Sequence, residues 1–252
     1  MKYFFSLLLI TPVIYAQEQM KPQDTEVWMP EPTVVVPGES TAPPGDAIIL
    51  FDGSDTALWR HEGSKETVKW TINADHSLTV KPGTGNIETI AEHGSIQLHI
   101  EWKAPIAVKG EGQGRGNSGI FFQRRYEVQI LDSYNNRTYS NGQAASVYKQ
   151  HIPLVNAMRP TGEWQVYDII FNAPEYDAKG NEIKSGSITL IHNGVVVQNQ
   201  VELLGTTEYI GKPKIGRDVM PGDDNSSPKH RSLALQDHGD LVSFRNIWMR
   251  KL

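Results

Sequence analysis

The sequence predicts an all-β protein, an antiparallel two-sheet sandwich of the jelly-roll type. Short apolar or alternating segments recur at intervals of about 8–12 residues, with turn residues between them. No long stretch combines the helical period with capping residues at its ends. No segment repeats at a fixed period, so a propeller or a solenoid is not expected.

The expected strands follow one another along most of the chain. In order they are 48–51, 70–72, 78–80, 95–104, 120–130, 163–173, 187–200, 232–239 and 241–250. The segment 187–200 is expected to form a hairpin, because Asn193-Gly194 is the pair that best tolerates a positive φ at both centres of a type I′ turn. The residues expected in the core or packed on a sheet include Trp102, Val128, Ile130, Ile170 and Trp248.

The segment 96–103 shows the two-residue period of a half-buried strand most clearly. Its apolar residues, Ile96, Leu98, Ile100 and Trp102, share one face. Polar residues occupy the other face. Among them, His99 and Glu101 lie on the same side, and we expect that side to be solvated.

The composition is that of a folded globular protein. The 252 residues are 38% hydrophobic and 21% charged, and they include no cysteine. Disulfides and thiolate metal sites are therefore excluded. The net charge of −5, from 24 basic and 29 acidic residues, argues against nucleic acid as a main partner.

The N-terminus has the pattern of an export signal. Lys2 precedes an apolar segment, Tyr3 to Tyr15, that is too short to span a bilayer, and Ala16 is a suitable last residue before cleavage. The alternative is a buried strand, which the proline-rich segment that follows disfavours. We therefore expect an exported protein, periplasmic or secreted, with no transmembrane span.

The chain is expected to divide into three parts. Residues 1–16 form the signal peptide. Residues 17–45 contain six prolines, which favour an extended linker without its own core. Residues 46–252 form one domain.

The segment 125–132 carries the strongest candidate site. Tyr126, Val128 and Ile130 share one strand face, so Arg125, Glu127 and Gln129 share the other. A guanidinium, a carboxylate and an amide on one face suit sugar hydroxyls, and the carboxylate can act as acid or base. The alternative is a solvated outer face. Asp132 either couples with Glu127 or makes an Asx turn.

Two other segments call for comparison with known motifs. Gly114-x-Gly116-x-x-Gly119 has the spacing of a dinucleotide fingerprint, but β-prone residues follow it where a helix is required, so we reject that function. Near the C-terminus, Asp237 and His238 stand at a turn before a strand that carries Arg245. They are either site residues or simple turn residues. No HExxH, GxSxG or P-loop motif is present.

Five segments in this order resemble the 3-keto-disaccharide hydrolase family. They are FDGSD at 51–55, GNSGIFFQRRYEVQILDSY at 116–134, NAMRPTGEWQVYDIIFNAP at 156–174, HNGVVV at 192–197 and LALQDHGDLVSFRNIWMRKL at 233–252. The resemblance covers about residues 47–252. It implies the jelly roll of the concanavalin A-like lectins and glucanases, and an exported bacterial protein.

The resemblance also implies a substrate, a glycoside whose carbon 3 a partner oxidoreductase has oxidised to a ketone. The ketone acidifies the proton on carbon 2, so a protein base can remove it, after which the aglycone leaves carbon 1 and water adds. This chemistry needs a base, a donor for the enolate oxygen and a proton source. The sequence identifies no certain cofactor, and it leaves open whether a divalent metal stabilises the enolate.

The family match carries over to particular residues. From their chemistry, the catalytic candidates are Glu127, Asp132 and His238. The substrate-binding candidates are Arg125, Gln129, Gln143, Gln236 and Arg245, and either arginine is suited to hold the enolate oxygen. Two departures from the family pattern, Gln123-Arg124 and Ser243, are expected to alter charge at the rim of the site.

Two other functions compete with this one. A carbohydrate-binding jelly roll without catalysis would need the same arginine, glutamine and glutamate residues. An ordinary glucanase on this fold is expected to carry a Glu-x-Asp-x-x-Glu series, whereas Glu127 is followed by Gln129 and Asp132.

Overall fold

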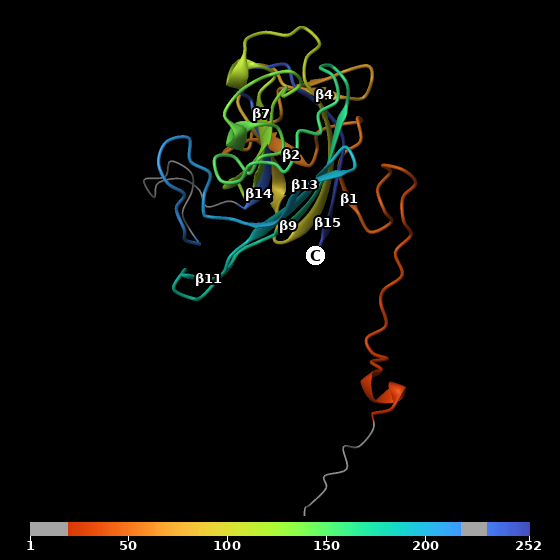
Figure 1. Cartoon of the computed structure of the whole chain (residues 1–252). Helices are drawn as coiled ribbons and strands as arrows, with labels where there is room; N and C mark the ends of the chain where they lie inside the picture. The colour runs from red at the N-terminus through yellow and green to blue at the C-terminus, as the bar shows by residue number, and fades with distance from the viewer. Residues whose placement is uncertain (1–19, 218–230) are drawn as a thin grey trace, which may run out of the picture. The chain divides into compact units, whose positions relative to one another are not determined.

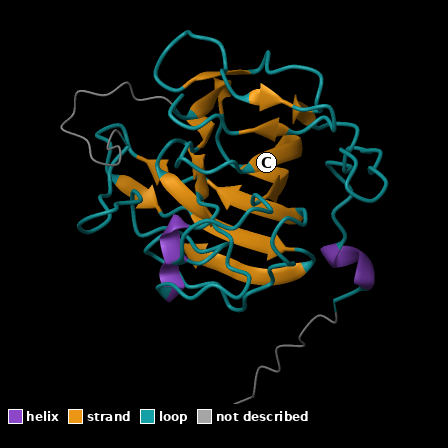
Figure 2. Ribbon diagram, turned by 90° about the horizontal axis from the view of Figure 1, so that it is seen from above, coloured by secondary structure: helices purple, strands orange, loops and turns teal. Residues whose placement is uncertain are grey.

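The computed structural model describes residues 20–217 and 231–252 and forms two antiparallel sheets (Figures 1 and 2). The larger sheet has eight strands in the order β13 (Val195–Glu202), β12 (Ser187–His192), β9 (Gln165–Asn172), β6 (Ile96–Lys103), β15 (Ser243–Lys251), β4 (Leu78–Thr79) and β3 (Thr71–Ile72), with β1 (Ile48–Phe51) also paired to β15. The five-stranded sheet runs β2 (Trp59–His61), β5 (Ile87–Glu92), β14 (Ser232–Leu235), β7 (Ser118–Phe122) and β8 (Tyr126–Ile130).

Helical structure in the described residues is limited to short 3-10 turns (Figure 2). They are Pro22–Thr25, Gly112–Gly114 and Ser140–Gly142. A small hairpin, β10 (Glu175–Tyr176) and β11 (Glu182–Lys184), projects from the sandwich (Figure 1). The all-β jelly-roll prediction is confirmed. No helix in the described ranges is long and apolar enough to cross a membrane.

The N-terminal boundaries stay predictions. The expected signal peptide lies outside the described residues. Residues 20–35 belong to a unit of their own, and a second, compact unit spans Val36–Leu252. All of the strands lie in the second unit.

Strand alternation builds the core between the two sheets. Ile96, Leu98, Ile100 and Trp102 of β6 are fully buried, as are Val128 and Ile130 of β8. Burying a side chain of this size contributes roughly 2 kcal/mol. The prediction for Ile170 is wrong: it is 42% exposed, because Ile169 and Phe171 are the β9 residues that face the core.

The outer face of the large sheet is not solvated at His99 and Glu101, contrary to expectation. Both are buried, and Trp248 stacks on the His99 ring at a centroid distance of 5.0 Å. The Thr41 carbonyl accepts hydrogen bonds from Asn246 Nδ2 (2.8 Å) and Trp248 Nε1 (3.3 Å). Residues just ahead of the first strand therefore cover this face.

The buried charges on that face compensate one another. Burial favours a neutral His99 ring, but its hydrogen bond with Asp168 (2.6 Å) and its ion pair with Glu101 (3.7 Å) outweigh burial and raise the pKa of His99 to about 9. Burial likewise favours a neutral Glu101, but hydrogen bonds from His99, Asn246 and Arg245 lower the pKa of Glu101 to about 2.

Two turns show the backbone geometry that the sequence requires. Asn193 (φ 52°) and Gly194 (φ 83°) join β12 to β13, which confirms the expected hairpin. Gln123 (φ 52°) and Arg124 (φ 57°) join β7 to β8, closed by a 3.0 Å hydrogen bond from the Arg125 amide to the Phe122 carbonyl. The second turn is strained, because neither residue is a glycine, an asparagine or an aspartate.

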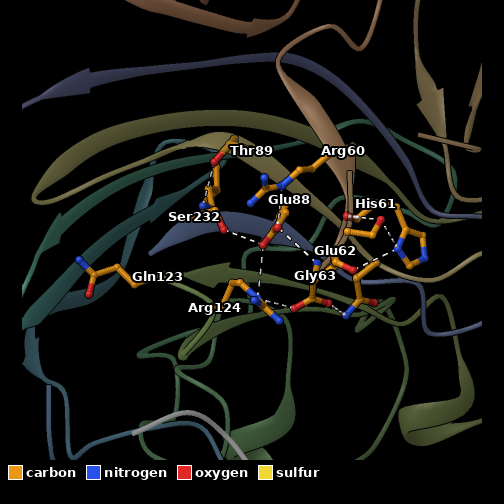
Figure 3. Close-up of polar contacts among 12 residues, drawn as sticks. Arg60, His61, Glu62, Gly63, Glu88, Thr89, Gln123, Arg124 and Ser232 are labelled. Carbon is orange, nitrogen blue, oxygen red and sulfur yellow. Dashed lines mark hydrogen bonds and ion pairs between the residues drawn. The ribbon is translucent and has the colours of Figure 1, made fainter. Parts of the chain in front are cut away.

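A buried carboxylate anchors the strained turn to the rest of its sheet (Figure 3). Glu88 on β5 accepts from Arg60 Nε at Oε1 (2.8 Å) and from Ser232 Oγ at Oε2 (2.7 Å), and Arg124 Nε lies 3.4 Å from Oε2. Arg124 also donates to Glu62 at 2.6 Å. The turn that leads into β8 is thus tied to β2, β5 and β14.

Replacing Glu88 with glutamine is expected to destabilise the fold by about 3 kcal/mol, because the largely buried Arg60 guanidinium loses its charged acceptor and Arg124 loses one of its two. The measurement is the free energy of unfolding in urea. Glu66→Gln is the matched control, since Glu66 pairs with Lys69 at 2.8 Å on the exposed surface and such pairs contribute less than about 1 kcal/mol. Equal effects of the two substitutions would contradict the anchoring role.

Candidate functional site

A cavity of about 480 Å³ opens on the face of β8 that points away from the core. Strands β7 and β8 supply Phe121, Glu127 and Gln129 to its lining. Phe121 and Glu127 are paired across the two strands, as are Gly119 and Gln129. The volume is in the range of pockets that hold small molecules.

The carboxyl group of Glu127 is the one carboxyl group among the described residues that line this cavity. Glu127 is 5% exposed, and it forms no ion pair with a described lysine, arginine or histidine. Burial raises the pKa of Glu127 to about 8. The group is therefore a much stronger base than an ordinary glutamate.

The residues beside this carboxyl group are uncharged, and one of them is small enough to leave space for it. A Cβ atom at residue 119 would lie 2.6 Å from Glu127 Oε1, so the glycine there is needed for space. The Gln129 side-chain amide is oriented with its nitrogen toward Glu127. This nitrogen donates to Glu127 Oε1 at 3.0 Å and to the Ser118 carbonyl at 3.2 Å. An amide supplies a hydrogen bond without supplying a compensating charge.

The edge of β8 is covered by two segments that bring further residues to the cavity. The Tyr148 amide donates to the Glu127 carbonyl at 3.0 Å. The Glu127 amide in turn donates to Thr207 Oγ1 at 2.9 Å. Tyr148 and Thr207 both line the cavity, so the contacts that protect the strand edge also build its walls.

Amide side chains form much of the polar lining. They are Gln113, Asn117, Gln129 and Gln236. The backbone N–H of Gln236 donates to the Gly119 carbonyl at 3.0 Å. The side-chain Oε1 of Gln236 is buried without a hydrogen-bond partner among the described residues. Amides of this kind both donate to and accept from sugar hydroxyls.

Aromatic rings form a second part of the wall. Phe121, Tyr139, Tyr148 and Tyr209 line the cavity. The Tyr139 and Tyr148 hydroxyl oxygens are 2.6 Å apart. Gly142 lies against Tyr139, since a Cβ there would be 2.1 Å from the ring.

The structure brings four of the predicted site residues together. Glu127, Gln129, Gln236 and His238 all line the cavity, with His238 on the exposed turn after β14. Asp237, beside it, holds that turn by accepting from the Gly85 and Gly239 amides, each at 3.0 Å. Asp237 thus has a structural role.

The other four predicted residues do not line the cavity. Asp132 is paired with Arg115 (2.7 Å) and also accepts from Thr161, so it fastens loops together. Gln143 is not part of the lining, and its Oε1 is buried without a hydrogen-bond partner in the part of the chain that the structure describes. Arg125 is buried, and its Nη1 donates to the Gly216 carbonyl at 3.4 Å.

Arg245 belongs to the other sheet. Its Nε donates to Glu101 at 2.7 Å, and its guanidinium carbon lies 4.2 Å from the centre of the Trp164 ring. The two departures from the family pattern also fall away from the cavity: Arg124 pairs with Glu62 and Glu88, and Ser243 Oγ lies 2.7 Å from Thr79 Oγ1. The expected change of charge at the rim is therefore wrong for both.

The part of the cavity wall that loops supply was not predicted from the sequence. Tyr139, Tyr148, Lys149, Thr207 and Tyr209 come from loops, where no period shows which side chains face a cavity. The polar, tyrosine-containing stretch between β8 and β9 was the available signal. Within the described ranges, no group of three or more His, Cys, Asp or Glu side chains is arranged to hold a metal ion.

The sequence is similar to one protein family and to a named bacterial protein. A family model described as a 3-keto-alpha-glucoside-1,2-lyase-like domain matches residues 46–250. A Bacteroides thetaiotaomicron protein named 3-keto-disaccharide hydrolase is 26% identical, over 94% of this chain and 90% of that protein.

Solved structures agree with this relationship. A Parabacteroides distasonis protein, provisionally described as a glycosyl hydrolase, is 43% identical with a TM-score of 0.84, covering 96% of this chain and 100% of that one. A second protein of that organism, 18% identical with a TM-score of 0.54 over 82% of this chain and 94% of that one, shows the shared fold. Since the family model matches most of the sequence, this chain belongs to the family of 3-keto-alpha-glucoside-1,2-lyase-like domains.

Proposed function

We propose that this protein cleaves 3-keto-glycosides by removing the proton on carbon 2, eliminating the aglycone and adding water. The observation that carries the proposal is Glu127, a buried carboxyl group in a cavity of sugar size, with a pKa of about 8 and no described cationic partner. Family membership and the name of the Bacteroides relative support the substrate class.

The first step uses Glu127 as the base. The ketone at carbon 3 lets the C2–H electron pair move onto the carbonyl oxygen while the carboxylate takes the proton. A base of raised pKa suits this weak carbon acid, because proton transfer becomes more favourable as the base strengthens. At neutral pH a minor fraction of Glu127 is ionised and ready to act.

The later steps release the aglycone and restore the sugar. The enolate electrons form a C1–C2 double bond, the C1–O bond breaks and the aglycone oxygen gains a proton. Exposed His238 is suited to supply that proton. Water then adds its oxygen to carbon 1 and a proton to carbon 2, so the products are a free 3-keto sugar and the aglycone alcohol.

The remaining lining residues are assigned to substrate binding. Gln113, Asn117, Gln129 and Gln236 are suited to the sugar hydroxyls, and the partnerless Oε1 of Gln236 is an acceptor ready for one of them. The substrate must be supplied by an oxidoreductase that oxidises carbon 3 of the glycoside.

A non-catalytic carbohydrate-binding module is the second candidate. The amides and aromatic rings of the lining favour it as much as they favour the enzyme. A binding module, however, has no use for a buried carboxyl group without a charged partner, which costs stability. The Glu127→Gln substitution distinguishes the two functions, because it removes a base that only the enzyme needs.

We also propose that the protein is exported and that its mature chain begins near Gln17, on the strength of Lys2 and the apolar segment 3–15. The expected result is that intact-mass measurement of protein from its native host finds a chain without residues 1–16. A mature chain that still carries Met1 would contradict export by cleavage.

The activity itself is tested with a 3-keto-glucoside and its unoxidised parent. We expect aglycone release from the keto form alone. Glu127→Gln keeps the side-chain shape and removes the base, so the turnover rate at saturation is expected to fall by about 10²–10⁴-fold. Asp132→Asn is the matched control, a second buried carboxylate that is outside the cavity.

The two outcomes of that test are distinct. If the Glu127→Gln protein turns over within a few-fold of the parent at saturation, Glu127 is not the base. Binding of the keto-glucoside by the parent protein without any release of aglycone would support the binding module instead.

A further inference from the structure

Lys149 has a backbone conformation that a lysine rarely adopts. Its φ is 58°, in the left-handed region, and its amide is held by the Asn141 carbonyl at 2.8 Å. The next two amides, of Gln150 and His151, both donate to the Val147 carbonyl. A residue with a Cβ costs about 1–2 kcal/mol in this region. Strain of this kind concentrates at functional sites.

The strained backbone places the Lys149 side chain in the cavity wall. Nζ lies 4.4 Å from the centre of the Tyr209 ring and 5.7 Å from the centres of the Tyr139 and Tyr148 rings. It also donates to the Tyr209 carbonyl. Three aromatic rings around one ammonium group favour the cation at this position.

Lys149 is the only lysine or arginine among the described residues that line the cavity. The arginines suggested by the sequence do not compete for its role, since Arg125 is outside the lining and Arg245 is on the other sheet. The other cavity residue that can carry a positive charge is His238, which is already assigned to the aglycone oxygen, so Lys149 is the cation left to stabilise an enolate.

Two tyrosines of the cavity lining are close to this cation and within electrostatic range of the base. Lys149 Nζ is equally distant from the Tyr139 and Tyr148 rings. Burial chiefly, with a smaller effect of the Glu127 charge, raises the pKa of both tyrosines, so both are within electrostatic range of Glu127. No direct ion pair joins Glu127 to Lys149, which leaves the two charges on separate parts of one cavity.

We propose that Lys149 is a catalytic residue whose ammonium group stabilises the negative charge on the carbon 3 oxygen of the substrate. This role rests on the proposed function. As Glu127 takes the proton from carbon 2, the C–H electron pair moves toward that oxygen, and a fixed ammonium donor lowers the energy of the enolate. The strained backbone conformation of Lys149 directs this donor toward the cavity.

The test separates enolate formation from aglycone release. The probe is 3-keto-1,5-anhydroglucitol, which has no leaving group, and the readout is exchange of its carbon 2 proton with deuterated water, followed by NMR. Lys149→Asn removes the charge while asparagine tolerates the left-handed backbone. Lys149→Arg keeps the charge, and Lys212→Asn removes an exposed lysine that does not line the cavity.

We expect Lys149→Asn to slow the exchange by about 10²–10³-fold, the loss typical of removing one oxyanion donor. Its melting temperature is expected to stay level or rise, because strain is relieved. Lys149→Arg should recover part of the rate, and Lys212→Asn should match the parent.

Exchange by Lys149→Asn within a few-fold of the parent would overturn the assignment. If that variant also releases aglycone slowly from a 3-keto-glucoside, Lys149 acts at the leaving group instead. Failure of the parent protein to exchange the proton or to release aglycone is a separate result, and it would remove the proposed function together with this role.

Discussion

The alternation of side chains along β8 is the constraint on which both the core and the site depend. Val128 and Ile130 must fill the space between the sheets, and this forces Glu127 and Gln129 onto the opposite face. Loops that cover the strand edge then close over that face. A carboxyl group that would be solvated on an open sheet is buried instead, and burial alone raises its pKa to about 8.

Period and turn chemistry made the fold and the β8 residues predictable from the sequence. The core faces of β6 and β8, the Asn193-Gly194 hairpin and the rejection of a dinucleotide site follow from local rules, and the structure agrees. Which of the other predicted site residues reach the cavity depends on long-range contacts, which local sequence rules do not predict. Arg245 shares a family motif with His238, yet the chain crosses from one sheet to the other between them, so only His238 reaches the cavity.

The two polar faces of the sandwich show why buried charge alone does not identify a site. On the outer face, His99 and Arg245 both pair with Glu101, and the pKa shifts of His99 and Glu101 favour the charged forms of these two groups. Such a network stabilises a covered surface. In the cavity, Glu127 has only a neutral amide beside it, and burial favours its neutral form. That opposite sign distinguishes a base held ready from a structural ion pair.

The pKa of Glu127 is the most direct test. Between about 4.5, the ordinary value, and 8, the folded protein keeps a proton that the unfolded chain releases, so this group lowers stability as pH rises through that window. Carboxyl NMR of glutamate-labelled protein, with Glu127→Gln to assign the signal, measures it. A midpoint near 8 is the predicted result, and a midpoint near 4.5 would contradict the account of the site.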